Sequence, residues 1–230
     1  MLQDKAIIIL SGGLDSTVAL YLAKEKYELN LALTFDYGQR SAKKEYEAAK
    51  KFCEILQLPH RLIELPWLKE ITQTALVNSS EVLPQLQSNE LDNMTVALKS
   101  ASAVWVPNRN GVFINIAASF AESLSAKVII TGFNAEEADT FPDNSEIFVK
   151  QINESLFYST QNHCFVEAPT ISMNKTEIVK EAIRLKLPFE NLWSCYEGGE
   201  KMCGKCESCL RSKRAFSENY LENLVQELFQ

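Results

Sequence analysis

The sequence predicts an α/β fold with a doubly wound, mainly parallel sheet, followed by a helical part near the C-terminal end. Short apolar runs alternate with segments whose apolar residues recur at helical spacing, which is typical of strand-helix-strand units. The 230 residues suffice for one domain with a large core plus an appendage. Four cysteines close together in the last quarter of the chain indicate a metal site in that appendage.

Each expected element has its own pattern. Apolar runs predict strands at Lys5 to Leu10, Leu29 to Phe35, His60 to Leu65, Lys127 to Gly132 and Phe165 to Ala168. Apolar residues three or four positions apart predict helices at Leu14 to Lys26, Ala42 to Leu56 and Val112 to Leu124. One last helix is predicted by an apolar stripe through Phe216, Tyr220, Leu221, Leu224, Val225 and Leu228. We expect this stripe to pack against the core more than to form an interface.

The pattern weakens between residues 66 and 106, where a polar stretch is either a mobile lid or an insertion. We therefore predict a nucleotide-binding α/β domain over residues 1–170, with a flexible insertion at about 68–103. A C-terminal helical, zinc-binding subdomain is predicted over residues 171–230.

Charge and hydropathy restrict the function classes. The chain has 23 Lys and Arg against 30 Asp and Glu, and a formal charge of -7 argues against a large nucleic-acid-binding face. The first residues lead directly into a strand, and no apolar run approaches the roughly 18 residues of a membrane helix. A cytoplasmic protein with small-molecule substrates and no nucleic-acid or membrane partner is expected.

The stretch from Leu10 to Thr17, Leu-Ser-Gly-Gly-Leu-Asp-Ser-Thr, joins a strand directly to a helix. Two glycines let backbone approach a ligand closely, and hydroxyls with free N–H groups at a helix start suit phosphate oxygens. Asp15 would repel phosphate by itself, so its presence indicates a magnesium ion between the carboxylate and the phosphates. The alternative is a plain turn in which Ser11 or Ser16 caps the helix.

Four cysteines, Cys195, Cys203, Cys206 and Cys209, have the spacing of a four-thiolate site. Four sulfurs with no open position suit structural zinc, while an iron-sulfur cluster and unligated thiols are the alternatives. The other two cysteines, Cys53 and Cys164, lie in apolar contexts and are expected in the core.

Several motifs together carry a family resemblance. The Ser-Gly-Gly-Leu-Asp-Ser-Thr loop after an N-terminal strand resembles the N-type ATP pyrophosphatase loop of adenine nucleotide alpha hydrolase-like folds. The remaining motifs resemble the 7-cyano-7-deazaguanine synthase family of queuosine biosynthesis, from about Lys5 to Phe216. They are Asp-Tyr-Gly-Gln-Arg at 36–40, Val-Pro-Asn-Arg-Asn at 106–110, Pro-Asp at 142–143, Ser-Cys-Tyr at 194–196 and Cys-Gly-Lys-Cys-Glu-Ser-Cys-Leu-Arg-Ser-Lys-Arg-Ala-Phe at 203–216.

The resemblance implies an ATP-dependent ligase that converts 7-carboxy-7-deazaguanine and ammonia to 7-cyano-7-deazaguanine. The carboxylate and then the amide would be activated by nucleotidyl transfer. It also implies a structural zinc, ATP with magnesium, and a homodimer. Two alternatives share the loop: an ATP-dependent tRNA-thiolating enzyme, and a nucleotide-binding module without catalysis.

The resemblance further implies roles for residues of the loop and of a second motif. Asp15, Ser16 and Lys175 are the expected catalytic residues, with Asp15 contacting magnesium and the Lys175 ammonium neutralising departing pyrophosphate. A solvated surface lysine is the alternative for Lys175. Nucleotide binding is expected from a continuous set of eleven residues: Leu10, Ser11, Gly12, Gly13, Leu14, Asp15, Ser16, Thr17, Val18, Ala19 and Leu20.

Substrate binding is expected from six residues: Tyr37, Gln39, Arg109, Asn110, Glu137 and Asp143. Asp143 is the first candidate to accept hydrogen bonds from the guanine-like edge, and Glu137 is the second. Helix capping is the alternative for Asp143 and for Asn110 or Asn108.

The chain departs from the family pattern at two places. Residues 136–143 are Glu-Glu-Ala-Asp-Thr-Phe-Pro-Asp, where the family pattern is Asp, an aromatic residue and Ser-Gly-Tyr-Pro-Asp. Phe141, Pro142 and Asp143 keep the aromatic residue and the Pro-Asp pair, but the Ser-Gly pair is lost. Ser41 stands where the family often has His.

Overall fold

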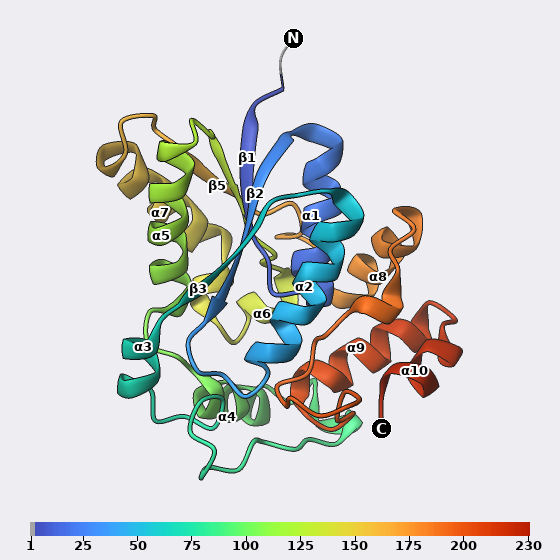
Figure 1. Cartoon of the computed structure of the whole chain (residues 1–230). Coiled ribbons are helices and arrows are strands. Elements are labelled where there is room, and N and C mark those ends of the chain that lie inside the picture. Colours follow the sequence, from blue (N-terminus) through green and yellow to red (C-terminus); the bar gives the residue numbers. More distant parts are fainter. Residues whose placement is uncertain (1–2) are drawn as a thin grey trace.

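The computed structural model describes residues 3–230 and is built on a parallel sheet of five strands (Figure 1). The strands are β1 (Lys5–Ile9), β2 (Glu28–Asp36), β3 (His60–Glu64), β4 (Val128–Ile130) and β5 (Phe165–Glu167). Their order is β3-β2-β1-β4-β5, and each neighbouring pair is parallel. The five predicted strands and the doubly wound, parallel sheet are confirmed.

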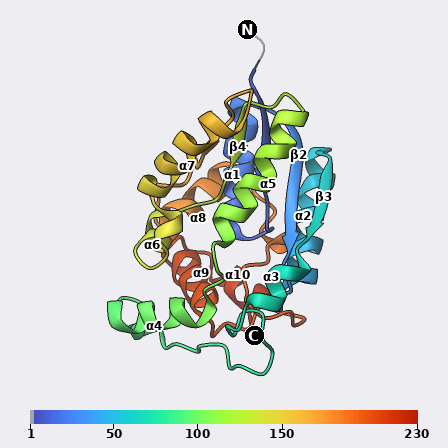
Figure 2. The same cartoon turned by 90° about the vertical axis from the view of Figure 1, so that its left-hand side faces the viewer.

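Helices cover both faces of this sheet (Figures 1 and 2). One face carries α1 (Leu14–Lys26), α2 (Ala42–Leu56) and α8 (Lys175–Arg184), and the other carries α5 (Arg109–Ser123) and α7 (Glu146–Ser159). Side chains of β1 alternate between the two apolar cores, with Ala6 and Ile8 in one and Ile7 in the other. This alternation is what a strand buried on both faces requires.

The strand order reverses beside β1. The chain goes from β1 outward to β2 and β3, then returns to β4 on the other side of β1. The carboxyl ends of β1 and β4 therefore mark the switch point, where ligands bind in sheets of this kind. The turn at Ser11 and the residues Thr131 and Gly132 lie at these two ends.

The segment predicted as an insertion is partly helical. It contains α3 (Pro66–Ile71), a short 3-10 turn at Ser88–Glu90, and α4 (Met94–Val104). The segment runs past the carboxyl edge of the sheet toward the C-terminal helices (Figure 2). There the Leu86 N–H donates to the Lys205 carbonyl at 3.2 Å, and Arg214 forms an ion pair with Asp92 at 2.8 Å.

The last apolar stripe forms two helices, so the prediction of one helix through Phe216 to Leu228 is wrong. Helix α9 (Glu207–Glu218) ends before Tyr220, and α10 (Glu222–Leu228) follows. Tyr220 has a φ of 61° and is 89% exposed, so it marks the break and stands outside the core. Leu221, Val225 and Leu228 still pack against the core, as the stripe predicted.

Three short elements connect these parts: α6 (Ala135–Ala138) and 3-10 turns at Pro142–Asn144 and Phe189–Asn191. Residues of α8 and α9 share one apolar core with α1 and α2, through Ile178, Phe216, Val18 and Phe52. The boundary near residue 170 stays a prediction. Within residues 3–230, no helix combines the length and the apolar character needed to cross a membrane.

Candidate active site

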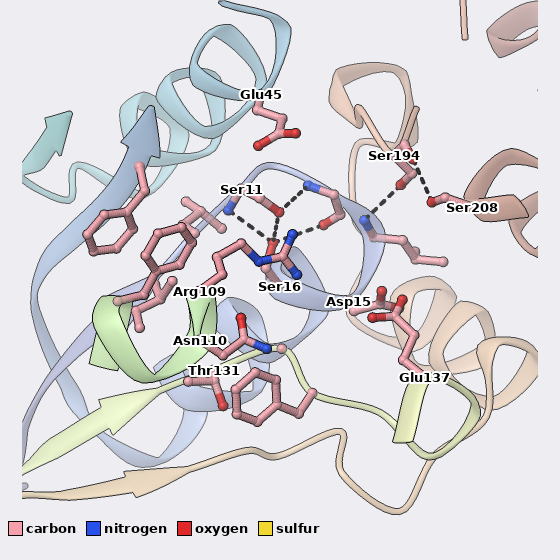
Figure 3. Close-up of a pocket in the computed structure, with 18 of the residues that line it drawn as sticks. Ser11, Asp15, Ser16, Glu45, Arg109, Asn110, Thr131, Glu137, Ser194 and Ser208 are labelled. Carbon is pink, nitrogen blue, oxygen red and sulfur yellow. Dashed lines mark hydrogen bonds between the residues drawn. The ribbon is translucent and has the colours of Figure 1, made fainter. Parts of the chain in front are cut away.

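The Ser11 loop connects β1 to α1 through a tight turn. Gly12 has a φ of +76°, and a Cβ there would lie 2.6 Å from the Ala48 Cβ, so only glycine fits. The loop closes on its own hydroxyls, with Ser11 Oγ 3.0 Å from Ser16 Oγ and the Gly13 N–H donating to Ser11 Oγ at 3.3 Å (Figure 3). A second glycine, Gly132, lets β4 approach, because a Cβ there would lie 2.5 Å from the Ser16 nitrogen.

This loop opens into a cavity of about 220 Å³. The cavity is lined by the β1 loop, the ends of β2 and β4, the start of α5 and the segment around Cys195. Of the eleven residues predicted to bind nucleotide, six line it: Leu10, Ser11, Gly13, Leu14, Asp15 and Ser16. Gly12 shapes the turn behind them, while Thr17, Val18, Ala19 and Leu20 are fully buried on the core side of α1.

Asp15, Glu137 and Lys175 meet at one end of the cavity. Lys175 is only 2% exposed, so it is not a solvated surface lysine. Its ammonium contacts the Asp15 carboxylate and lies 3.0 Å from Glu137 Oε1. The side chain is placed by the start of α8, where Asn174 accepts a hydrogen bond from the Glu177 N–H at 2.9 Å and caps the helix.

Two carboxylates therefore share one buried ammonium at the cavity wall. Burial raises the pKa of Asp15 to about 6, although Lys175 favours its ionised form. Burial also opposes charge on Lys175, but Asp15 and Glu137 hold the pKa of the ammonium above its ordinary value. The Asp15 Oδ1 atom is buried without a hydrogen-bond partner, which fits an oxygen reserved for a cation.

The Asp15 pKa predicts a pH dependence for nucleotide use. Protonated Asp15 cannot hold a cation, and the fraction protonated increases as the pH falls through about 6. We expect kcat/KM for ATP to fall about tenfold per pH unit below that point, since this parameter reports groups of the free enzyme. Initial rates between pH 5 and 9 test this, and a kcat/KM that stays flat down to pH 5 would contradict it.

The six predicted substrate residues separate into two groups. Tyr37, Arg109, Asn110 and Glu137 line the cavity, and the Arg109 guanidinium donates to the Tyr37 hydroxyl at 3.2 Å. Although burial opposes its charge, Arg109 has a raised pKa because Tyr37 and Asp143 favour the cation. Gln39 and Asp143 are not among the residues that line the cavity.

Gln39 and Asp143 each hydrogen-bond to a residue that lines the cavity. Gln39 is 3% exposed and bridges the end of β2 to Glu45, to which it donates at 3.1 Å. The Asp143 carbonyl accepts from Asn110 Nδ2 at 3.3 Å, and burial raises the pKa of its carboxyl group. Neither Asn108 nor Asp143 caps a neighbouring helix with its side chain, because α5 lacks a side-chain cap and Ser145 caps α7.

The altered segment at 136–143 joins the site to the C-terminal part. Glu136 accepts from Arg211 at 2.8 Å and from Arg214 at 3.3 Å, while its neighbour Glu137 faces Lys175. Trp105 stacks on Phe141 with ring centroids 6.2 Å apart. The acidic pair of this chain thus contributes one carboxylate to the cavity and one to an ion-pair network.

Sequence reasoning missed several cavity residues, including Glu45, Thr131, Tyr196 and Ser208. Glu45 lies in the first turn of α2. Acidic residues are common in the first turn of a helix, so nothing in the sequence indicated that Glu45 belongs to a binding site. The Thr131 hydroxyl is buried at the end of β4 without a partner. A signal for Thr131 was available, since it follows a strand at the switch point of the sheet.

The four predicted metal ligands, Cys195, Cys203, Cys206 and Cys209, come together. Their Sγ atoms all lie within 4.8 Å of one another, and Cys203 Sγ is 3.9 Å from Cys209 Sγ. A tetrahedron of Zn–S bonds of roughly 2.3 Å has edges of about 3.8 Å, so the sulfurs fit one tetrahedral ion. Cys53 and Cys164 are buried in the apolar cores, as predicted.

Backbone N–H groups surround these sulfurs. Glu197 and Cys203 donate to Cys195 Sγ at 3.3 Å, and Cys206 donates to Cys203 Sγ at 3.4 Å. Such bonds stabilise thiolates, which are the ligands that zinc requires.

Residues next to the cysteine cluster also hold the Ser11 loop. The Trp193 N–H donates to the Gly12 carbonyl at 3.0 Å, and the Leu14 N–H donates to Ser194 Oγ at 3.1 Å. Ser208 Oγ donates to the Ser194 carbonyl at 2.6 Å and ties α9 to the same segment. The residues next to Cys195 therefore fix the start of α1.

The sequence matches one family of known proteins over nearly the whole chain. Residues 5–220 match the family described as Queuosine biosynthesis protein QueC. The chain is 49% identical to the 7-cyano-7-deazaguanine synthase of Bdellovibrio bacteriovorus, covering 99% of this chain and 98% of that protein. It is 54% identical to the 7-cyano-7-deazaguanine synthase of Pelotomaculum thermopropionicum, covering 92% and 96%.

Among solved structures, the chain resembles the U34-tRNA thiolase NcsA from Methanococcus maripaludis with its 4Fe-4S cluster. The TM-score is 0.51 at 19% identity, with 99% of this chain and 72% of that chain covered, so the likeness concerns the fold alone. The family match, by contrast, spans the loop, the cavity and the four cysteines, and we conclude that the chain belongs to the QueC family of queuosine biosynthesis proteins.

Proposed function

We propose that this chain is an ATP-dependent carbon-nitrogen ligase that converts 7-carboxy-7-deazaguanine and ammonia to 7-cyano-7-deazaguanine. The observation that carries the proposal is the near full-length match to synthases of that name. The cavity supports it, because its lining includes the glycine-rich start of α1, the Asp15 and Glu137 carboxylates that contact Lys175, and three aromatic side chains, Phe35, Tyr37 and Phe113.

The first half of the reaction activates the carboxylate. A carboxylate oxygen attacks a phosphorus of ATP, and the nucleotidyl ester then carries a leaving group that the free carboxylate lacks. The pyrophosphatase-type loop favours attack at the α-phosphorus, so pyrophosphate leaves. Lys175 would neutralise negative charge as it departs. The start of α1 would bind phosphate oxygens through the N–H groups that make no hydrogen bond within the loop.

Ammonia then attacks the activated carbonyl carbon, the nucleotide leaves and an amide forms. Activation of the amide oxygen by a second nucleotidyl transfer allows a C–O bond to break. The two amide protons are lost, and a C≡N bond remains. Holding both reactants in one cavity removes much of the entropic barrier to each bimolecular step.

Two metals belong to this proposal. Asp15 would hold a magnesium ion, which supplies charge neutralisation at the phosphates. The four cysteines would hold one structural zinc, because a four-iron cluster needs volume of its own between thiolates that here lie within 4.8 Å. A homodimer and a cytoplasmic location complete the proposal.

A tRNA-thiolating enzyme is the second candidate, favoured by the cysteine cluster and the shared fold. It requires an iron-sulfur cluster or a catalytic thiol, together with a basic RNA path. A colourless protein with one zinc per chain would exclude its cluster-dependent form.

Omission assays test the function directly. We expect ATP turnover only when 7-carboxy-7-deazaguanine is present, and nitrile formation only when ammonia is also supplied. ATP turnover that is unchanged when both are left out would refute the proposal.

A further inference from the structure

Glu45 places a third carboxylate in the cavity, away from the Asp15 and Glu137 pair. It comes from the first turn of α2, and Figure 3 shows its carboxylate on the opposite side of the Ser11 loop from Glu137. Within residues 3–230 Glu45 forms no ion pair, whereas Asp15 and Glu137 share Lys175. Among the described residues, the site therefore holds a carboxylate without an ion pair, although Arg109 lines the same cavity and its positive charge favours the ionised form of Glu45.

Hydrogen bonds from two neighbouring side chains fix the orientation of the Glu45 carboxylate. Ser41 Oγ donates to Oε1 at 2.5 Å, and Gln39 Nε2 donates to Oε2 at 3.1 Å. Gln39 is itself held at the end of β2, because it accepts from the Tyr37 N–H and donates to the Phe35 carbonyl, both at 3.0 Å. Each carboxylate oxygen can accept two hydrogen bonds, so each keeps one acceptor position.

Aromatic rings form part of the wall of the cavity that Glu45 lines. Phe35 stacks on Phe113 with ring centroids 4.1 Å apart and an interplanar angle of 5°, and Tyr37 lies 5.6 Å from Phe113. All three rings line the cavity. A cavity with both a flat apolar surface and two fixed acceptors suits a planar heteroaromatic ring with two adjacent N–H donors.

We propose that Glu45 is the specificity-determining residue that accepts hydrogen bonds from the ring N–H and the 2-amino group of the deazaguanine. This inference rests on the proposed function. The deazaguanine ring presents two donors side by side, which match the two oxygens of one carboxylate. Adenine presents an amino group beside a ring nitrogen with a lone pair, which an ionised carboxylate would repel.

The assignment moves this contact from Asp143, which does not line the cavity, to Glu45, which does. It also orients the substrate. The 7-carboxylate is on the five-membered ring, away from the edge that Glu45 would hold, so it is free to face the Ser11 loop. Burial raises the pKa of Glu45, and two N–H donors from the ring would favour the ionised form again.

A substrate and enzyme double-mutant cycle tests this contact. The variant is Glu45→Gln, and the second substrate is an analogue of 7-carboxy-7-deazaguanine without the 2-amino group. We expect the variant to raise KM for 7-carboxy-7-deazaguanine roughly 10- to 100-fold, as for a lost charged hydrogen bond. KM for ATP should stay within about twofold. In the wild-type enzyme, KM for the analogue should be raised about as much as KM for the natural substrate is raised in the variant. In the variant, KM for the analogue should increase little further, because the contact is already lost.

Two further variants complete the test. Glu54→Gln, on the exposed side of the same helix, should behave as wild type. Glu45→Asp keeps the carboxylate but shortens the side chain, so the carboxylate lies further from the substrate. It should show an intermediate KM for 7-carboxy-7-deazaguanine, and it serves as the test if Glu45→Gln folds poorly. An equal penalty for the analogue in wild type and in Glu45→Gln would overturn the inference, as would a KM increase for ATP as large as that for the acceptor. A wild-type protein with no turnover of 7-carboxy-7-deazaguanine would instead refute the proposed function itself.

Discussion

Replacing Lys175 by methionine is expected to lower kcat by roughly 10²- to 10³-fold, the usual effect of removing one group that stabilises developing charge. Methionine keeps the length of the side chain but leaves Asp15 and Glu137 without the ammonium that they share. Removing one partner from a buried ion pair also costs about 3–5 kcal/mol of folding stability. Steady-state rates and thermal unfolding, measured on the same preparation, separate the two effects.

The matched control is Lys180→Met, because Lys180 is an exposed residue of the same helix. This variant should keep wild-type kcat and unfolding temperature. If Lys175→Met, at a temperature where it is fully folded, retained kcat within threefold of wild type, the role given to the ammonium would be wrong.

Removing the metal by Cys209→Ser is expected to abolish both metal content and nucleotide binding. Binding of structural zinc contributes roughly 10–16 kcal/mol in small zinc domains, so its loss should lower the unfolding temperature markedly. Nucleotide binding should suffer too, because the segment beside Cys195 holds the Gly12 carbonyl and the Leu14 N–H. Metal analysis, thermal unfolding and ATP titration measure the three effects.

Cys164→Ser serves as the control. Cys164 is equally buried, but it lies in the opposite apolar core and contacts Thr160 rather than the cluster. We expect one zinc per chain and normal ATP affinity in this variant. Full ATP affinity in a metal-free Cys209→Ser protein would show that the cluster does not support the loop.

Local patterns were enough to predict the sheet and the turn that joins β1 to α1. The strands are apolar runs between turn residues, and the loop follows directly from β1, so no long-range information was needed. The four cysteines were predictable for the same reason, since three of them lie within seven residues of chain. The break in the helix at Tyr220 could not be predicted, because the apolar stripe continues through this residue with unchanged spacing.

The electrostatic partners could not be predicted from the sequence. Lys175 and Asp15 are 160 positions apart, and their contact depends on how α8 packs against α1. Likewise Glu45 looks like an ordinary acidic residue of a first helical turn until the fold places it in the cavity. Side chains of this kind acquire their role from tertiary packing, which local periodicity does not encode.

The most direct test of the account is mass spectrometry of the product formed from 7-carboxy-7-deazaguanine, ATP and ammonium labelled with heavy nitrogen. The account predicts 7-cyano-7-deazaguanine with a single heavy nitrogen, in the nitrile, and AMP with pyrophosphate in the same reaction. Recovery of unchanged 7-carboxy-7-deazaguanine, or of a product without the label, would contradict it.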